Sequence, residues 1–163
     1  MPKKIHDPLD KMSKMQQRTV GASVDIAWGN HGVALQKWEK TLKKDPLHVE
    51  GLSYKLYILT DCAFNKKFSS EWEYIRKALH ETATFVVENI VPKPLASLDY
   101  KSKDFKKESD KVMLYCKAQY ALGLLFLEEG KISEAIVCAN EGLKMYPKDP
   151  DLPYILKRAQ KKK

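Results

Sequence analysis

The 163-residue sequence predicts an all-α protein built as a stack of antiparallel helix pairs. Three observations predict this fold class. Apolar residues recur at three- and four-residue steps over most of the chain, which is the period of helices with one buried face. Glycine, asparagine and proline gather between these segments, where turns are expected. One helix–turn–helix unit, residues 116–149, also has weaker copies earlier in the chain.

The unit 116–149 carries small residues, a leucine, an aromatic residue and a proline at fixed offsets. They are Leu122, Gly123, Phe126, Gly130, Ala135, Gly142 and Pro147. Gly123 lets the backbone of a crossing helix approach closely, and Gly130 suits a tight turn that needs positive φ. The pattern resembles the tetratricopeptide repeat. The resemblance implies an α-solenoid, a superhelix of antiparallel helix pairs with a C-terminal capping helix, that binds other molecules.

The same spacing organises the rest of the chain. Setting Pro46 at the offset of Pro147 gives a second copy at residues 15–48, and a third copy follows at 49–91. We expect a helical domain over 9–160, interrupted by an irregular loop at 92–104 and closed by a capping helix at 151–160. The remaining segments are a basic, flexible N-terminus (1–8) and a basic tail (161–163).

Composition is that of a folded helical domain. Hydrophobic residues make up 44% of the chain, which is enough for a core. The longest apolar run is far shorter than the ~20 residues that cross a membrane, so we expect no membrane span. The start of the chain lacks the apolar segment of a secretion signal, and the three cysteines are an odd, scattered set. These features favour a cytoplasmic protein with reduced thiols.

The family resemblance implies which residues face a ligand, because first helices of such repeats line a concave groove. Carried over by alignment, the groove residues are Glu50, Ser53, Tyr57, Thr60 and Asp61 in the middle copy, and Lys117, Tyr120, Leu124, Leu127 and Glu128 in the last copy. In the first copy they are Gln16, Thr19, Ser23, Ile26 and Ala27.

The charges of these residues indicate what the groove would bind. The two later copies supply three acids and only Lys117 as a base, within a chain of net charge +8. Such a groove suits a peptide segment of another protein with apolar and basic residues, because charge complementarity selects partners. Members that bind acidic chaperone tails need several basic or amide residues, of which only Lys117 is present. We therefore do not expect a chaperone tail as partner.

Motifs for catalysis, metals or cofactors are missing from the sequence. Neither form of glycine-rich phosphate loop occurs, and His80-Glu81 is not followed by a second histidine at 84. The histidines and cysteines have no metal-ligand spacing. We expect no catalytic residues, no metal and no cofactor, and a function as a non-catalytic adaptor or co-chaperone-like module.

Two alternative functions remain. The first is an RNA-binding or anionic-surface-binding protein that uses the basic loop 93–107 and the basic termini. Its candidate anionic-ligand patch is Lys101, Lys103, Lys106 and Lys107, interleaved with Tyr100 and Phe105 but diluted by nearby acids. The second is a fixed structural subunit of a multiprotein complex, with contacts on the convex face or on the loop 92–104.

Overall fold

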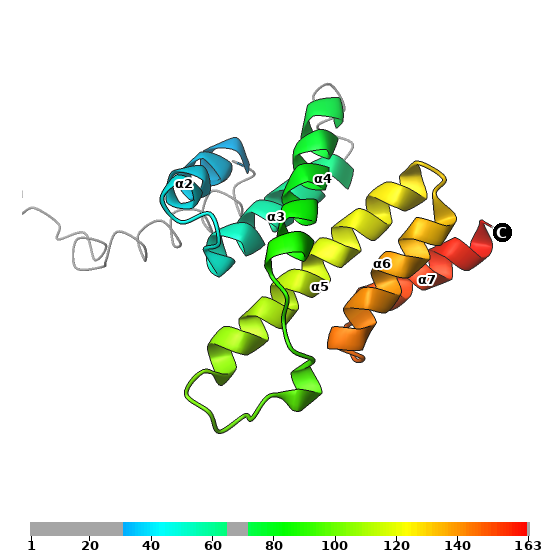
Figure 1. Cartoon of the computed structure of the whole chain (residues 1–163). Helices are drawn as coiled ribbons and strands as arrows, with labels where there is room; N and C mark the ends of the chain where they lie inside the picture. Colours follow the sequence, from blue (N-terminus) through cyan, green and yellow to red (C-terminus); the bar gives the residue numbers. More distant parts are fainter. Residues whose placement is uncertain (1–30, 65–71, 163) are drawn as a thin grey trace, which may run out of the picture.

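The structure is a computed structural model that describes residues 31–64 and 72–162, and within them it is all-helical (Figure 1). The α-helices are α2 (His31–Lys44), α3 (Val49–Phe64), α4 (Trp72–Asn89), α5 (Phe105–Glu128), α6 (Ile132–Met145) and α7 (Leu152–Lys161). A short 3-10 helix, η3 (Leu95–Ser97), precedes α5, and these residues form no strand. The predicted all-α class is confirmed for this part of the chain. The part of the copy at 15–48 that precedes residue 31 lies outside the described residues.

Each helix packs against the next helix in the chain, from α2 to α7. Two further contacts skip one element, because α3 packs on α5 and α5 packs on α7. Helix α5 therefore lies at the centre, with α3 and α4 on one side and α6 and α7 on the other (Figure 1). This arrangement brings one face of α3, α5 and the start of α7 close together.

The core is built from large apolar side chains near the N-terminal end and from smaller ones near the C-terminal end. Trp38 of α2 is fully buried and stacks on Tyr54 of α3, with ring centroids 5.0 Å apart. Leu79 of α4 and Leu125 of α5 continue this core. Burying side chains of this size stabilises the fold by about 1.5–3 kcal/mol each.

Helix α5 ends in a glycine-dependent turn, as its sequence predicts. Gly130 has φ +76°, a left-handed conformation that costs other residues energy. The amide of Lys131 donates to the carbonyl of Phe126 at 2.8 Å, and the amide of Gly130 donates to Leu127 at 3.3 Å. These two bonds satisfy carbonyls that the helix end would leave unpaired. The ammonium of Lys162 also donates to the Leu127 carbonyl, at 2.7 Å.

Two further glycines bring the C-terminal helices close together. A Cβ added at Gly123 of α5 would lie 3.1 Å from Ile155 of α7, so α7 sits directly on the α5 backbone. A Cβ added at Gly142 of α6 would overlap Leu152, which is fully buried. The thiol of Cys116 donates to the Gly142 carbonyl at 3.5 Å in the same region.

The connection between α4 and α5 contributes to the core, although its sequence predicts only an irregular loop. Leu95 and Leu98 are half-buried and pack against Val112 and Cys116 of α5 and against Leu152 of α7. The two leucines are three residues apart around η3, so they share one side of that turn. The loop is thereby fixed to the base of the α5–α7 unit.

Helix boundaries lie close to the expected ones. Helix α4 ends at Asn89, close to the end of the copy expected at 49–91, and α7 covers 152–161, where 151–160 was expected. Helix α5 begins at Phe105 and is therefore longer than the first helix of the unit 116–149. None of the helices in the described ranges is both long and apolar enough to cross a membrane.

Candidate functional site

Five of the predicted groove residues line one cleft, which we call the Tyr57 cleft. Its lining is Leu56, Tyr57, Thr60 and Asp61 of α3, Lys117 and Tyr120 of α5, and Asp151 at the start of α7. The cleft has a volume of about 270 Å³. Leu56 is fully buried and forms its floor, whereas Tyr57 is 53% exposed and stands at its rim. The packing of α3 and α7 on α5 creates this site.

Tyr120 connects the cleft to the core beneath it. Its side chain is half-buried and packs against two groups of core residues, one around Ile155 and one around Leu152. Burial raises the pKa of the Tyr120 phenol, and the nearby carboxylate of Asp151 raises it further. The phenol therefore stays protonated and can donate or accept a hydrogen bond. The cleft combines a neutral aromatic wall with charged groups at its edge.

Leu124 and Leu127 do not belong to this cleft, which corrects the expectation that they anchor a ligand. Leu127 is only 3% exposed and lies in a core cluster with Ala135 of α6 and Ile155 of α7. Leu124 is half-buried against the same cluster. The physical reason is α7, which covers the last turns of α5.

The remaining predicted groove residues lie apart from the cleft. Glu50 is exposed in the first turn of α3. The pKa of the Lys106 ammonium is raised mainly by Asp110, and the charge of Glu50 adds a small contribution. Ser53 is half-buried and Glu128 is exposed at the end of α5. The groove residues expected between 16 and 27 lie outside the described residues.

Sequence reasoning missed the contribution of α7. The unit 116–149 predicts copies before it, and its period also extends beyond residue 149. Counting the 34-residue unit length on from Lys117 and Tyr120 leads to Asp151 and Tyr154. Asp151 lines the cleft, and Tyr154 lies close enough to influence the Tyr120 phenol. The signal that could have found both residues was the repeat period itself.

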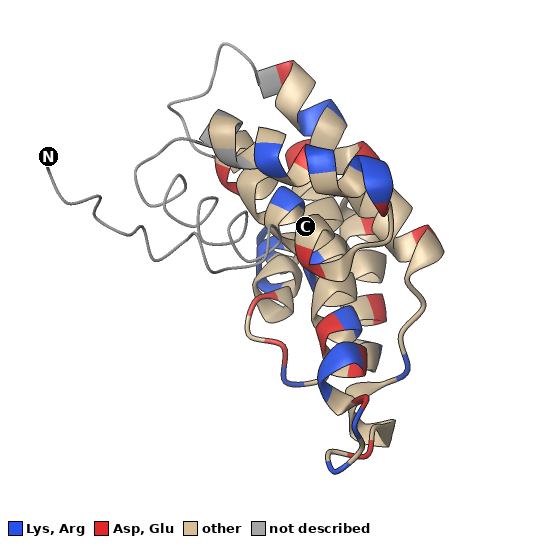
Figure 2. Ribbon diagram, turned by 90° about the vertical axis from the view of Figure 1, so that its left-hand side faces the viewer, with Lys and Arg blue, Asp and Glu red and all other residues tan. Residues whose placement is uncertain are grey.

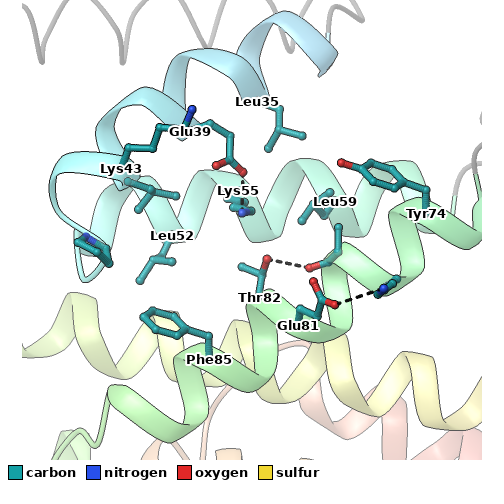
Figure 3. Close-up of a pocket in the computed structure, with 14 residues that line it drawn as sticks. Leu35, Glu39, Lys43, Leu52, Lys55, Leu59, Tyr74, Glu81, Thr82 and Phe85 are labelled. Atoms are coloured by element: carbon teal, nitrogen blue, oxygen red, sulfur yellow. Dashed lines mark hydrogen bonds and ion pairs between the residues drawn. The ribbon is translucent and has the colours of Figure 1, made fainter.

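A larger pocket, which we call the Tyr74 pocket, lies on another side of α3 (Figure 3). It has a volume of about 570 Å³ between α2, α3 and α4. Leu52, Leu59 and Phe85 line its apolar part. No described residue of this pocket's lining also lines the Tyr57 cleft, so the two hollows are separate.

Charges around the Tyr74 pocket are largely paired. Lys55 of α3 forms an ion pair with Glu39 of α2 at 2.6 Å, and Lys77 pairs with Glu81 along α4 at 4.0 Å. Lys43 also lines this pocket, which therefore carries two carboxylates and three ammonium groups. The Tyr57 cleft carries two carboxylates and one ammonium, so the two hollows have net charges of opposite sign.

The candidate anionic-ligand patch is exposed but carries mixed charge. Lys101, Lys103, Lys106 and Lys107 all reach solvent. Lys106 pairs with Asp110 at 3.0 Å, and Lys101 lies 5.5 Å from the ring centre of exposed Tyr100. Figure 2 shows acidic and basic residues interspersed along the loop and the helices in this view. The patch is a place where an anion could make contact, without a concentrated field.

Comparisons with models of known protein families, with curated proteins and with solved structures gave no match for this chain. Among residues 31–64 and 72–162, no three histidine, cysteine, aspartate or glutamate side chains are grouped so as to hold a metal ion. The geometry of the two hollows and the loop is therefore what bears on function.

Proposed function

We propose that this chain is a non-catalytic, tetratricopeptide-like helical-repeat module that holds a segment of another protein in the Tyr57 cleft. The observation that carries the proposal is the convergence of Tyr57, Thr60, Asp61, Lys117 and Tyr120 on one cleft. These residues come from two helices and occupy ligand-facing offsets of the repeat that the sequence resembles.

The packing of alternate helices supports the same proposal. In a stack of helix pairs, first helices contact the first helices of neighbouring pairs and form the inner surface. Here α3 contacts α5, and α5 contacts α7, while each also packs on its own partner helix. On this interpretation α7 has the position of a further first helix, and its exposed side is polar enough to close the stack.

The chemistry of the cleft indicates the kind of segment. Tyr57 offers an exposed aromatic ring and Leu56 an apolar floor, which suit an apolar side chain. Asp61 and Asp151 outnumber Lys117 among the charged residues, so a basic residue is favoured over an acidic one. A segment with apolar and basic residues fits both features.

Paired tyrosine variants test the proposal. The wild-type protein and the variants Tyr57→Ala and Tyr74→Ala are used to capture partners from cell extract, and captured proteins are quantified by mass spectrometry. Tyr57→Ala should capture specific partners in amounts at least fivefold lower than the wild type, because it removes the aromatic ring at the rim of the cleft. Tyr74→Ala is the matched control, since Tyr74 is 76% exposed and lies at the other pocket. Loss with Tyr74→Ala alone would instead support a structural subunit that uses its outer surface.

Binding of an anionic surface or RNA is a second candidate with one observation in its favour. Tyr100 is 73% exposed beside Lys101, which is an arrangement that can stack on a base. The interspersed acids make this the weaker candidate. It predicts affinity that falls steeply with salt and is lost when Lys101, Lys103 and Lys107 are replaced by glutamine.

A further inference from the structure

Asp151 stands at the N-cap position of α7, yet its side chain does not cap the helix. Asp149 performs this role instead. Its Oδ1 atom accepts hydrogen bonds from the backbone amides of Asp151 and Leu152, both at 2.9 Å. The carboxylate of Asp151 is therefore not needed by the helix, and it lies exposed at the edge of the Tyr57 cleft.

Aromatic and charged groups surround this carboxylate. Tyr57 is exposed at the rim, and the half-buried Tyr120 lies close enough for its phenol to be influenced by Asp151. Asp61 and Lys117 complete the charged lining, which sums to one negative charge. A volume of about 270 Å³ is below the ~300–1,000 Å³ of pockets for drug-sized molecules, so the cleft is the size for one long side chain.

We propose that the Tyr57 cleft receives an arginine side chain of the bound segment, with its guanidinium paired to Asp151 and stacked on the Tyr57 ring. This inference rests on the proposed function and names the residue that the cleft selects. Arginine fits better than lysine, because its planar group binds a carboxylate through two parallel hydrogen bonds. The same planar group stacks on an aromatic face and is more weakly hydrated than an ammonium.

The positive charge of Lys117 opposes binding of an arginine, so neutralising Lys117 and neutralising Asp151 should change the affinity in opposite directions. A cationic ligand in the cleft is repelled by the Lys117 ammonium and attracted by the Asp151 carboxylate. Neutralising Asp151 should therefore weaken binding of an arginine segment, and neutralising Lys117 should strengthen it. A patch that only needs apolar contact would respond to neither change.

The experiment uses four acetylated and amidated seven-residue peptides that differ only at the central position. The sequence Leu-Ala-Ala-X-Ala-Ala-Leu carries Arg, Lys, Gln or Glu at X. Binding to the full chain is measured by nuclear magnetic resonance titration of backbone amides at low salt. We expect the order Arg, Lys, Gln, Glu, with about tenfold between Arg and Gln. Amides of residues 57–61, 117–121, 151, 152 and 154 should shift most.

Three variants complete the test. Asp151→Asn should reduce the Arg-to-Gln preference by about fivefold, and Lys117→Gln should tighten the Arg peptide by about twofold. Glu81→Gln is the matched control, because that exposed carboxylate lies at the Tyr74 pocket. Asp151→Asn should lower the thermal midpoint only slightly, since Asp149 retains the cap hydrogen bonds and only the favourable interaction of the charge with the helix dipole is lost.

Equal affinity of the Arg and Gln peptides, or an Arg preference that survives Asp151→Asn, would overturn the arginine pocket. Equal affinity of Arg and Lys peptides would overturn the stacked guanidinium. Failure of all four peptides to bind would also overturn it. These outcomes leave the proposed function to its own test, the capture of partners by the Tyr57→Ala and Tyr74→Ala variants.

Discussion

The unit formed by α5, α6 and α7 and the unit formed by α2, α3 and α4 pack different side chains on their glycines. In the C-terminal unit, aliphatic Ile155 and Leu152 lie against Gly123 and Gly142. In the N-terminal unit, Gly51 of α3 lies against Leu42 and the ring of Trp38, and this ring also stacks on Tyr54. Glycine allows close contact in both units, but the N-terminal unit adds an aromatic stack at that contact.

The two units also differ in the hollows they form. The N-terminal unit contains the Tyr74 pocket of about 570 Å³, whose lining is mostly apolar and locally ion-paired. The Tyr57 cleft lies instead where α3 of one unit meets α5 and α7 of the other. The junction of the two units thus brings together charged and aromatic residues from three helices.

Truncating a buried leucine in each unit tests the contrast most strongly. Leu152→Ala should lower the free energy of unfolding by about 3–5 kcal/mol, because Leu152 is fully buried where α6 and α7 touch. Leu52→Ala should cost about 2–3 kcal/mol, since Leu52 borders an existing pocket into which its surroundings can relax. Urea unfolding followed by circular dichroism measures both. A cost for Leu52→Ala equal to that of Leu152→Ala would mean that the N-terminal unit is packed as tightly.

Alkaline pH should weaken the C-terminal unit through its buried thiols. Burial raises the pKa of Cys116 from 9.0 to about 12, and that of Cys138 from 9.0 to about 11. Above pH 9 the unfolded chain loses these protons while the folded chain keeps them, so stability falls as pH rises from 9 towards 11. The expected slope is about 1 kcal/mol per pH unit for each thiol.

Urea unfolding at pH 8, 9 and 10 measures this slope. The control is the Cys116→Ala, Cys138→Ala double variant, which should show a shallower dependence across the same range. An identical slope in the double variant would show that these two thiols do not cause it.

The turn between α5 and α6 should show a smaller effect. Gly130→Ala is expected to cost about 1 kcal/mol, because alanine resists the φ of +76° that this position requires. Gly130→Asn should cost less, since asparagine tolerates left-handed backbone. Thermal unfolding of the two variants gives the comparison. If alanine were tolerated as well as asparagine, the turn would not depend on its left-handed residue.

The surface ion pair of the N-terminal unit should have the smallest effect. Lys77→Gln removes the pair with Glu81, but the two side chains are 77% and 66% exposed. We expect a change below about 0.5 kcal/mol in the free energy of unfolding, because water and salt screen such pairs. A loss above 1 kcal/mol in urea unfolding would indicate that this pair holds α4 in place.

Local features of the fold could be predicted from the sequence because they depend on near neighbours. The periodic apolar residues predict α-helices. Gly130 and Pro147 predict helix ends close to where α5 and α6 end. The burial of Leu95 and Leu98 could not be predicted, because a loop has no period to show which residues face inward. That information lies in contacts with α5 and α7.

The candidate site was predictable in part for the same reason. Tyr57 and Tyr120 lie in the cleft at offsets that the repeat resemblance assigned to the ligand-facing side of their helices. Leu127 does not, because α7 folds back over the end of α5 and covers it. Asp151 was missed because it had been assigned only to a closing helix. Long-range packing decides which side of a helix stays open.

The anchored connection between α4 and α5 has a consequence for recognition. Because Leu95 and Leu98 pack this segment against α5 and α7, the link between the two units is a rigid connection and not a flexible linker. A ligand that contacts both α3 and α5 binds to two helices whose spacing is already fixed. Its binding therefore does not include the entropic cost of ordering the two units. Selectivity can then follow from shape before any side chain moves.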